Sequence, residues 1–351
     1  MTKKMIHRIN WYLWTAGLMI LMSVIGFGKS TYADNMSFSV LPVLPENQSD
    51  SSKTYFDLKM NPNQEEVLEV NITNNTDEEI TVLVETNTAL TNDNGVADYS
   101  QSKKEKDSSL QVGFSDIAKA EEKEITLQGK ETKAAKIQVN MPAQEYDGLI
   151  LGGLYFTEKE KDSEEKMEKG MQIKNKFAYV IGVSLRENDH EVKTILECND
   201  VTPDQVNYRN VVKINLQNTQ PEIVKDLNVD AKVYTEKGTE VLHETKKENM
   251  KMVPNSNFNY AVSWDNKEFK PGKYRVEIES EADGQLYKWV KYFTISADKA
   301  NKLNDKAVEL EEESKILLYV VIGLAVLLIV LAIAFIIYWR KNKQKAELKE
   351  S

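Results

Sequence analysis

Apolar and polar residues alternate along most of the chain between residues 34 and 297. The clearest run places Phe177, Tyr179, Ile181, Val183 and Leu185 at every second position. A period of two is typical of a strand with one buried face. Similar runs recur near residues 68–72, 80–84, 137–141, 212–216, 227–233, 258–264 and 274–278. This spacing predicts a mainly β protein built from immunoglobulin-like antiparallel β-sandwiches.

The order of strands and turns occurs twice. Residues 68–84 read as a strand, an Asn-Asn-Thr-Asp turn and a second strand. Residues 212–229 read as a strand, an Asn-Thr-Gln-Pro turn and a second strand. We therefore predict two tandem sandwiches, over residues 34–192 and 193–297.

Longer apolar runs lie near both ends of the chain. The first, from Trp11 to Phe27, follows basic residues and is followed by Ala33, which suits a cleavage site. This pattern predicts a signal peptide over residues 1–33, and the alternative is an uncleaved N-terminal anchor.

The second run, residues 316–338, carries no charge and is followed by the basic segment 339–351. It predicts one transmembrane helix. The positive-inside rule then places the body outside the cell membrane and the C-terminal tail in the cytoplasm, as a single-pass protein. Helical spacing over residues 298–315 predicts a short stalk helix before the span.

Charge and cysteine content narrow the class of protein. The net charge is −10, with +4 over residues 1–33 and +3 over residues 340–351, so the segment between them carries −17. An acidic body of this size argues against nucleic acid as a partner. The single cysteine, Cys198, excludes an intrachain disulfide. We interpret it as a small buried residue, with a nucleophile or an intermolecular bridge as the alternative.

No catalytic or metal-binding motif stands out. His190 and His243 lack a metal-ligand spacing to a cysteine or to another histidine. We therefore predict no cofactor, no metal and no enzymatic activity. A wall hydrolase working through two carboxylates remains the alternative.

Aromatic residues and glycines offer candidate binding positions. Trp264 is in phase with its apolar neighbours and is expected in the core, whereas Tyr287 and Trp289 are candidates for a partner site. Gly152 and Gly153 interrupt an apolar strand. They predict either a kink between sheets or a close approach of a ligand.

Several stretches together resemble one known family. They are residues 38–48, 55–58, 61–64, 91–99, 142–156 and 174–183, and the fifth of them contains both Asp147-Gly148 and Leu151-Gly152-Gly153. With them, the chain resembles the WxL-interacting proteins of Gram-positive bacteria. The resemblance implies a first domain that binds peptidoglycan, and a second that binds WxL-domain surface proteins or host extracellular-matrix proteins.

The resemblance also guides the choice of binding residues. For the wall-facing site we predict Asn92, Asn94 and Tyr99 in one loop, and Tyr146, Asp147, Gly152 and Gly153 in another stretch. For the partner site we predict Tyr287 and Trp289. A host-adhesion protein without a specific role at the wall is the alternative.

Overall fold

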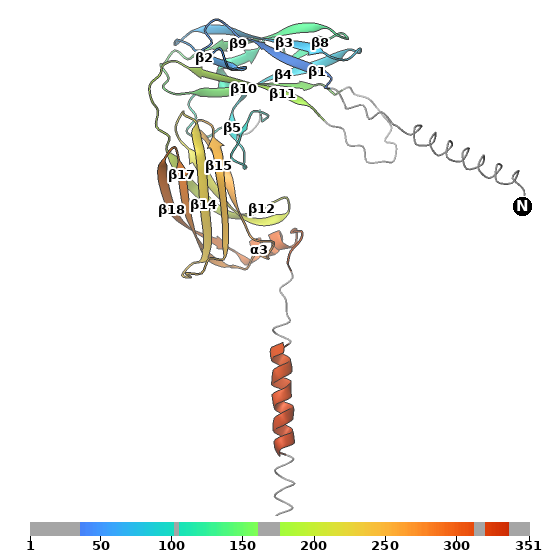
Figure 1. The fold of residues 1–351 in the computed structure, drawn as a ribbon, viewed down its shortest axis with the longest axis vertical. Coiled ribbons are helices and arrows are strands. Elements are labelled where there is room, and N and C mark those ends of the chain that lie inside the picture. Colours follow the sequence, from blue (N-terminus) through green and yellow to red (C-terminus); the bar gives the residue numbers. More distant parts are fainter. Residues whose placement is uncertain (1–35, 102–104, 161–175, 312–319, 337–351) are drawn as a thin grey trace, which may run out of the picture.

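The computed structural model describes residues 36–101, 105–160, 176–311 and 320–336. The predicted signal peptide (1–33) and basic tail (339–351) lie outside the described residues. The described chain is mainly β, and it forms two bodies, one above the other in Figure 1.

The first body is a sandwich of two sheets. Its first sheet has the order β1-β3-β9-β7, and its second has the order β2-β11-β10-β4-β8. The strands of the first sheet are β1 (Phe38–Val43), β3 (Glu65–Asn74), β9 (Thr132–Asn140) and β7 (Ala118–Ala120). Those of the second are β2 (Phe56–Lys59), β11 (Ala178–Arg186), β10 (Ile150–Glu158), β4 (Ile80–Thr88) and β8 (Glu124–Leu127). A small hairpin, β5 (Leu90–Thr91) with β6 (Ala97–Asp98), and the short helix α2 (Phe114–Ile117) complete this body.

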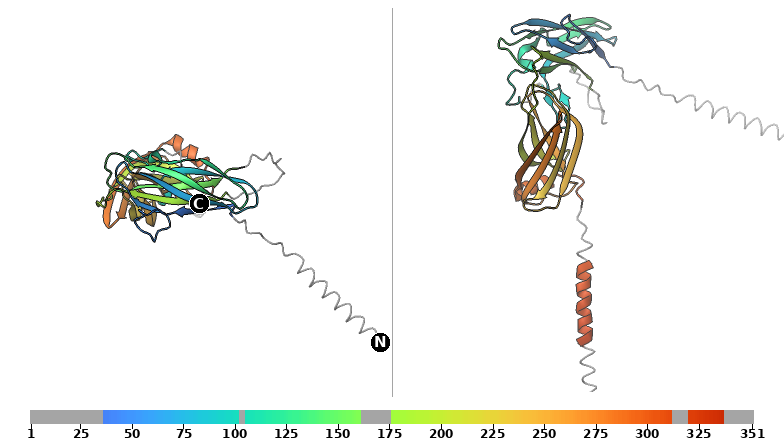
Figure 2. Two further views of the ribbon diagram at one scale, coloured as in Figure 1. Left: turned by 90° about the horizontal axis from the view of Figure 1, so that it is seen from above. Right: turned by 60° about the vertical axis from the view of Figure 1, so that its left-hand side comes forward.

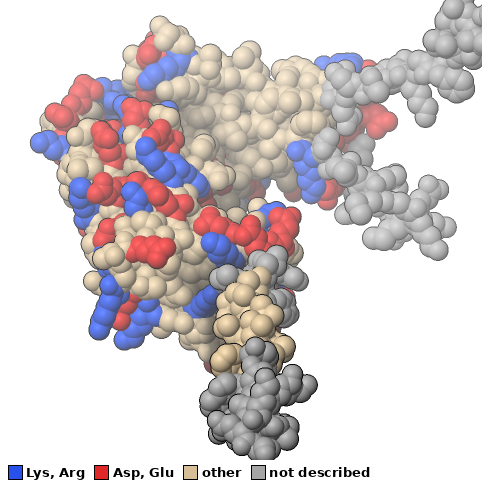
Figure 3. All heavy atoms as spheres, turned by 60° about the horizontal axis from the view of Figure 1, so that its bottom comes forward, with Lys and Arg blue, Asp and Glu red and all other residues tan. Residues whose placement is uncertain are grey.

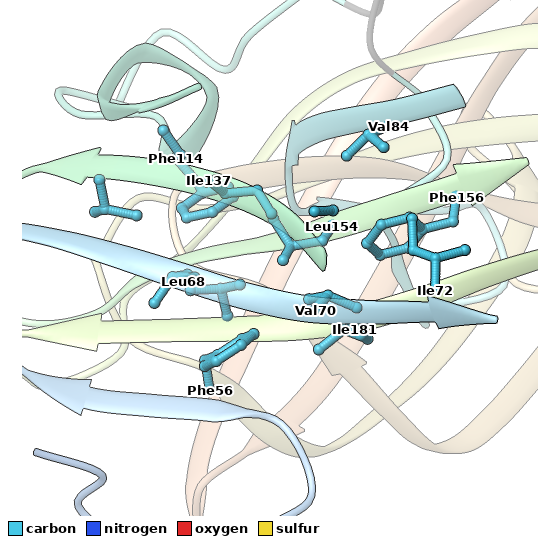
Figure 4. Packing of buried hydrophobic residues seen from close by; sticks show 14 of the residues in the cluster. Phe56, Leu68, Val70, Ile72, Val84, Phe114, Ile137, Leu154, Phe156 and Ile181 are labelled. Carbon is cyan, nitrogen blue, oxygen red and sulfur yellow. The ribbon is translucent and has the colours of Figure 1, made fainter. Parts of the chain in front are cut away.

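One continuous apolar cluster fills the space between these two sheets. Alternate residues of β3, such as Leu68, Val70 and Ile72, are fully buried and face Leu154 and Phe156 of β10 (Figure 4). The period of two in the sequence is therefore the period of burial, as half-buried strands require.

The second body is also a sandwich. One sheet has the order β12-β13-β16 and the other β15-β14-β17-β18. The strands are β12 (Leu196–Val206), β13 (Arg209–Asn218), β16 (Ser256–Ser263), β15 (His243–Met252), β14 (Val224–Thr235), β17 (Gly272–Ala282) and β18 (Gln285–Ile295). Its core is a separate cluster within residues 196–303. The prediction of a mainly β, sandwich-type protein is confirmed. One pair, β2 with β11, is parallel, where we expected antiparallel pairing.

The sequence repeat corresponds to a repeated corner. Asn74 and Asn218 each end a strand, and both side chains have an exposed fraction of 0%. The amide of Asn74 donates to Glu78 O at 2.7 Å, and that of Asn218 donates to Glu222 O at 2.7 Å. Each corner carries the chain from one sheet to the other, and the buried asparagine side chain bonds to backbone carbonyls there.

The segment after the second sandwich does not stand away from it. Helix α3 (Ala297–Asn304) begins at Ser296, whose side chain accepts a hydrogen bond from Lys299 N, and it buries Ala300 and Leu303 in the second core. The chain beyond it stays attached, because Val308 N donates to Tyr208 O at 2.9 Å. In its described part, residues 298–311, the predicted stalk is helical only as far as Asn304, and it is packed on the sandwich.

The predicted membrane anchor is not supported. The described part of the C-terminal helix covers residues 320–336 (Figure 1), and parts of the predicted span 316–338 lie outside the described residues. Across the described residues, no helix is both long and apolar enough to cross a membrane. The prediction of a single-pass cell-membrane protein with a cytoplasmic C-terminus is therefore wrong on this finding.

The two sandwiches meet at an angle. In both views of the molecule from the side, the strands of the first sandwich run across the long axis of the second (Figures 1 and 2). The sheet that contains β4, β10 and β11 faces the second sandwich, and the β5–β6 hairpin reaches down onto it.

Candidate functional site

The β5–β6 hairpin connects the first sandwich to the second. Thr91 Oγ1 lies 2.6 Å from Ser256 Oγ and accepts a hydrogen bond from Val253 N at 3.1 Å. Lys251 N donates to Gly95 O at 2.8 Å. Because these bonds are short and largely buried, the hairpin is fixed on strands β15 and β16.

Asp107 makes a second connection. Its buried carboxylate accepts hydrogen bonds from the side-chain amides of Gln217, at 2.7 Å, and Asn257. Ser109 N and Oγ donate to it as well. Burial by itself would raise the pKa of Asp107, but the bonds from Asn257, Ser109 and Gln217 hold it below its ordinary value. The carboxylate is therefore ionised at neutral pH and fully used in holding the two sandwiches together.

Gly148 makes the third connection. Its φ is +100°, and a Cβ at this position would lie 2.4 Å from Pro221 O. The next residue, Leu149, donates its N–H to the same carbonyl at 2.7 Å. Only glycine combines this conformation with such a close approach. We call these three connections the joint: residues 91–96, 107–109 and 148–149 against residues 217–222 and 250–259.

The predicted loop residues Asn92 and Asn94 lie at this joint. Asn92 Oδ1 accepts a hydrogen bond from Asn94 N at 2.9 Å, which shapes the tight turn, while the Asn94 side chain is exposed. The neighbouring Asp93 accepts from Asn259 N at 3.0 Å. This loop thus has a structural task, in which Asn92 Oδ1 accepts hydrogen bonds from Asn94 N and Val96 N.

Tyr146 and Asp147 lie beside the joint, in different environments. Tyr146 has an exposed fraction of 8%, and burial raises its pKa to about 12. Asp147 is exposed and bonded to Asn188 Nδ2 and His190 Nδ1, at 2.8 and 2.9 Å. The His190 and Asn188 bonds lower the pKa of Asp147. The tyrosine ring is a core residue, so within this pair only Asp147 is open to a ligand.

The two predicted glycines face opposite sides of β10. A Cβ on Gly152 would lie 2.2 Å from the Phe114 ring in the core, and a Cβ on Gly153 would lie 2.8 Å from the Tyr99 ring on the outer face. The strand keeps its register with both β4 and β11 through this point, so no kink occurs there. Each glycine makes room for an aromatic ring.

Tyr99 and Tyr55 lie on the outer face of the sheet formed by β2, β11, β10 and β4. Gly153 pairs with Gly182 of β11, and a Cβ on Gly182 would be 3.9 Å from Tyr55. Asn87 Nδ2 donates to Tyr99 O at 2.8 Å and holds that residue in place. Burial raises the pKa of Tyr99, and the nearby Tyr55 adds to the effect. The two tyrosine rings thus lie beside the strand backbone at the paired glycines Gly153 and Gly182.

Strand β18 carries the predicted partner residues on its inner side. The rings of Tyr287 and Trp289 stack 5.6 Å apart and pack against the second core. The residues that alternate with them point outward. They are the exposed Lys288, which pairs with Glu279, and Leu286, Val290 and Tyr292, whose exposed fractions are 59%, 53% and 65%. We call Leu286, Val290 and Tyr292 the β18 row. It lies on the last strand of its sheet. Side chains alternate between the two faces of a strand, so the row faces away from the predicted Tyr287 and Trp289.

Other candidates are structural. Trp264 is 3% exposed and stacks on His243 at 4.0 Å, which confirms its expected place in the core. Cys198 is buried, and burial raises its pKa to about 11, so it behaves as a small core residue and not as a nucleophile. No group of metal-binding side chains occurs in the described parts of the chain.

Sequence reasoning missed Tyr55, Asp107 and the β18 row. Tyr55 precedes a short strand, Asp107 lies in a charged stretch that reads as solvated, and the row has the same apolar pattern as the inward face of β18. Of these three features, only the β18 row could have been found from the sequence, because residues 286–295 are largely apolar on both faces of the strand.

Comparison with known sequences gives a family for both bodies. Residues 38–158 match the family described as "WxL Interacting Protein, peptidoglycan binding domain", and residues 168–305 match the one described as "WxL Interacting Protein, host binding domain". No curated protein matches the sequence.

Comparison with solved structures finds bacterial chaperones. The chain is similar to the E. coli chaperone DraB, with 13% identity, 74% of this chain and 97% of that chain covered, and a TM-score of 0.29. It is also similar to a chain of the CsuC–CsuE chaperone–tip adhesion subunit pre-assembly complex from Acinetobacter baumannii, with 10% identity, coverage of 73% and 98%, and a TM-score of 0.33. At these values the likeness carries no argument about function.

Proposed function

This chain belongs to the WxL-interacting protein family and is a cell-surface binding protein, and from that premise we propose that it is an adaptor of the Gram-positive cell wall. The first sandwich holds peptidoglycan, and the second holds a partner protein. Both matching families are described as binding domains, which supports a non-catalytic role.

The observation that carries this proposal is the joint. Two binding domains on a flexible linker would act independently, whereas a buried hydrogen-bonded contact fixes their relative geometry. Asp107, Thr91 and Leu149 of the first sandwich are all bonded to the second. A rigid connection suits an adaptor, because it holds the bound partner protein at a fixed position relative to the bound wall.

The division of the chain follows the same proposal. We place the first domain at residues 34–192 and the second at residues 193–297, with α3 packed onto the second. Two separate apolar clusters, within residues 38–185 and 196–303, support this division.

For the partner we propose a WxL-domain protein, bound at the β18 row. An exposed apolar row on a strand at a sheet edge is a common docking surface, since both its side chains and its backbone edge can pair. A host extracellular-matrix protein is the rival occupant, because the second family is described by host binding.

A co-sedimentation assay tests the adaptor. The purified full-length chain is mixed with peptidoglycan stripped of anionic polymers and with a WxL-domain protein. We expect the WxL-domain protein to sediment only when the chain is present. The double variant Leu286→Ser/Val290→Ser should sediment with peptidoglycan but without the WxL-domain protein. The control Val67→Ser, which changes an exposed residue of the first sandwich, should behave as wild type.

Two results would count against the proposal. If the chain stays in the supernatant, it does not bind the wall. If it sediments but never carries a WxL-domain protein, while it captures a matrix protein such as fibronectin, then host adhesion is the better description.

A further inference from the structure

The outer face of the sheet β2-β11-β10-β4-β8 carries its charged side chains around two central strands that have none. Asp57 and Lys59 lie on β2 at one edge, where Lys53 pairs with Asp57 and lies over the Tyr55 ring, and Glu124 lies on β8 at the other edge. Glu85 lies on β4, and Arg186 is the last residue of β11. The outward positions of β10 within residues 151–157 and of β11 within residues 178–184 carry no charged side chain.

The uncharged centre of this face is open to solvent. Seen from below, a broad surface without charged side chains lies next to the second sandwich, whose own surface is dense in both charges (Figure 3). Tyr55 has an exposed fraction of 37% and Val180, on the neighbouring strand, one of 44%. A surface of this kind in an acidic protein indicates a binding face for an uncharged ligand.

Three tyrosines give the face its chemistry. Tyr99 lies on Gly153, Tyr55 lies beside Gly182, and Tyr155 follows on the same side of β10, where it pairs with Val180 and Glu85. The two glycines pair with each other across β10 and β11, so no side chain rises between the first two rings. We call Tyr55, Tyr99, Tyr155, Gly153 and Gly182 the tyrosine face.

We propose that the tyrosine face binds the glycan strand of peptidoglycan by stacking of sugar rings on Tyr55 and its neighbours. This inference rests on the proposed binding of the wall by the first sandwich. A pyranose ring presents a flat face of C–H groups that packs well on an aromatic ring, and its hydroxyl and acetamido groups bond to polar atoms at the margin.

Charge selects the glycan among the components of the wall. An anionic wall polymer is repelled by the body, which carries −17 between residues 34 and 339. A stem peptide carries carboxylates and amines, and these need charged partners that the centre of the face does not supply. The alternating amino sugars of the glycan strand are uncharged along their length once the lactyl groups are amidated by peptide.

The test compares variants of the full-length chain in sedimentation with stripped peptidoglycan. Loss of one stacking ring should weaken binding by about tenfold, so Tyr55→Ala should show this loss. The control Tyr292→Ala removes a ring of the second sandwich that is even more exposed, at 65% against 37% for Tyr55, and should bind as wild type.

A second variant leaves every tyrosine in place. Gly182→Val has space for its Cβ and favours the strand, but its methyl groups rise beside Tyr55. It should lose binding to a similar degree. The matched control is Ala134→Val, which adds the same methyl groups at an exposed position on the opposite sheet.

Competition identifies the ligand. Soluble glycan strands whose peptides are removed and whose lactyl carboxylates are capped as amides should displace the chain from peptidoglycan, and free stem peptides should not. If stem peptides displace it instead, or if Tyr55→Ala and Gly182→Val bind as wild type, the tyrosine face is not the glycan site, although wall binding stands. If the wild-type chain does not bind peptidoglycan at all, both the proposed function and this inference fail.

Discussion

Asp107 of the first sandwich and Asn257 of the second are joined by a hydrogen bond, although 150 residues separate them in sequence. Gln217 donates to the same carboxylate at 2.7 Å. The joint between the sandwiches is therefore centred on a buried anion that accepts hydrogen bonds from Gln217, Asn257 and Ser109, and these bonds compensate for its loss of hydration.

Asp107→Asn should weaken the joint. The new amide group places a donor against the amide donors of Gln217 and Asn257, which leaves at least one buried donor unpaired. The expected cost in the free energy of unfolding is about 1–3 kcal/mol. Denaturant unfolding measures it, and hydrogen exchange of residues 105–110 should rise. The exposed Asp77→Asn should stay within about 0.5 kcal/mol, and equal effects of the two variants would contradict a special role for Asp107.

Gly148→Ala should destabilise the joint more than Gly284→Ala. Both glycines have positive φ, +100° and +78°, so both variants strain the backbone. Only Gly148 faces an obstacle, because its new Cβ would meet Pro221 O, whereas Gly284 has nothing within 4 Å. We expect about 1 kcal/mol for Gly284→Ala and at least twice that for Gly148→Ala. Thermal unfolding of both variants gives the difference, and similar midpoints would rule out the close contact.

The two corner asparagines should be equally important for their own sandwiches. Asn74→Ala removes the side-chain bonds to Glu78 O and Leu127 O, and Asn218→Ala removes those to Glu222 O and Val253 O. Each substitution should cost about 1–3 kcal/mol, since the bonds to Leu127 O and Val253 O are buried. Calorimetry of both variants tests this expectation, with the exposed Asn75→Ala as a control. If only one of the two variants lowers the free energy of unfolding, the two corners do not contribute equally to stability.

The second sandwich should lose stability in mild acid. Burial lowers the pKa of His243 below its ordinary value of 6.5, and the bond to Asp265 at 2.7 Å offsets only part of that effect. Below pH 6.5 the unfolded chain binds a proton that the folded chain does not. The free energy of unfolding therefore falls between pH 6.5 and the folded pKa, by at most about 1.4 kcal/mol per pH unit. Urea unfolding at pH 7.5 and 5.5 should show the loss in wild type and its absence in His243→Gln.

Cys198 should be unreactive in the folded protein. Its thiol is buried and its raised pKa leaves almost no thiolate at pH 8. A thiol reagent such as dithionitrobenzoate should label it only after denaturation, at least a hundredfold faster than before. Prompt labelling of the native chain would mean that β12 opens readily or that the thiol has another role.

The alternation of apolar residues determined the class of fold by itself. A strand buries every second side chain, so Leu68, Val70 and Ile72 could be assigned to a core without knowledge of their neighbours. The repeated Asn turns likewise predicted two similar bodies, because Asn74 and Asn218 perform a local task. The family resemblance depended on sequence stretches and was also sound.

Positions on surfaces depended on contacts that are distant in the chain. Gly148 has the residue type of a binding loop, but it packs against a carbonyl of the second sandwich, supplied by Pro221, which is far along the chain. The sequence alone likewise could not choose between the two faces of β18, since both are apolar. Only the packing of Tyr287 and Trp289 onto the second core decided which side stays exposed, because burial depends on the neighbouring sheet and not on the strand itself.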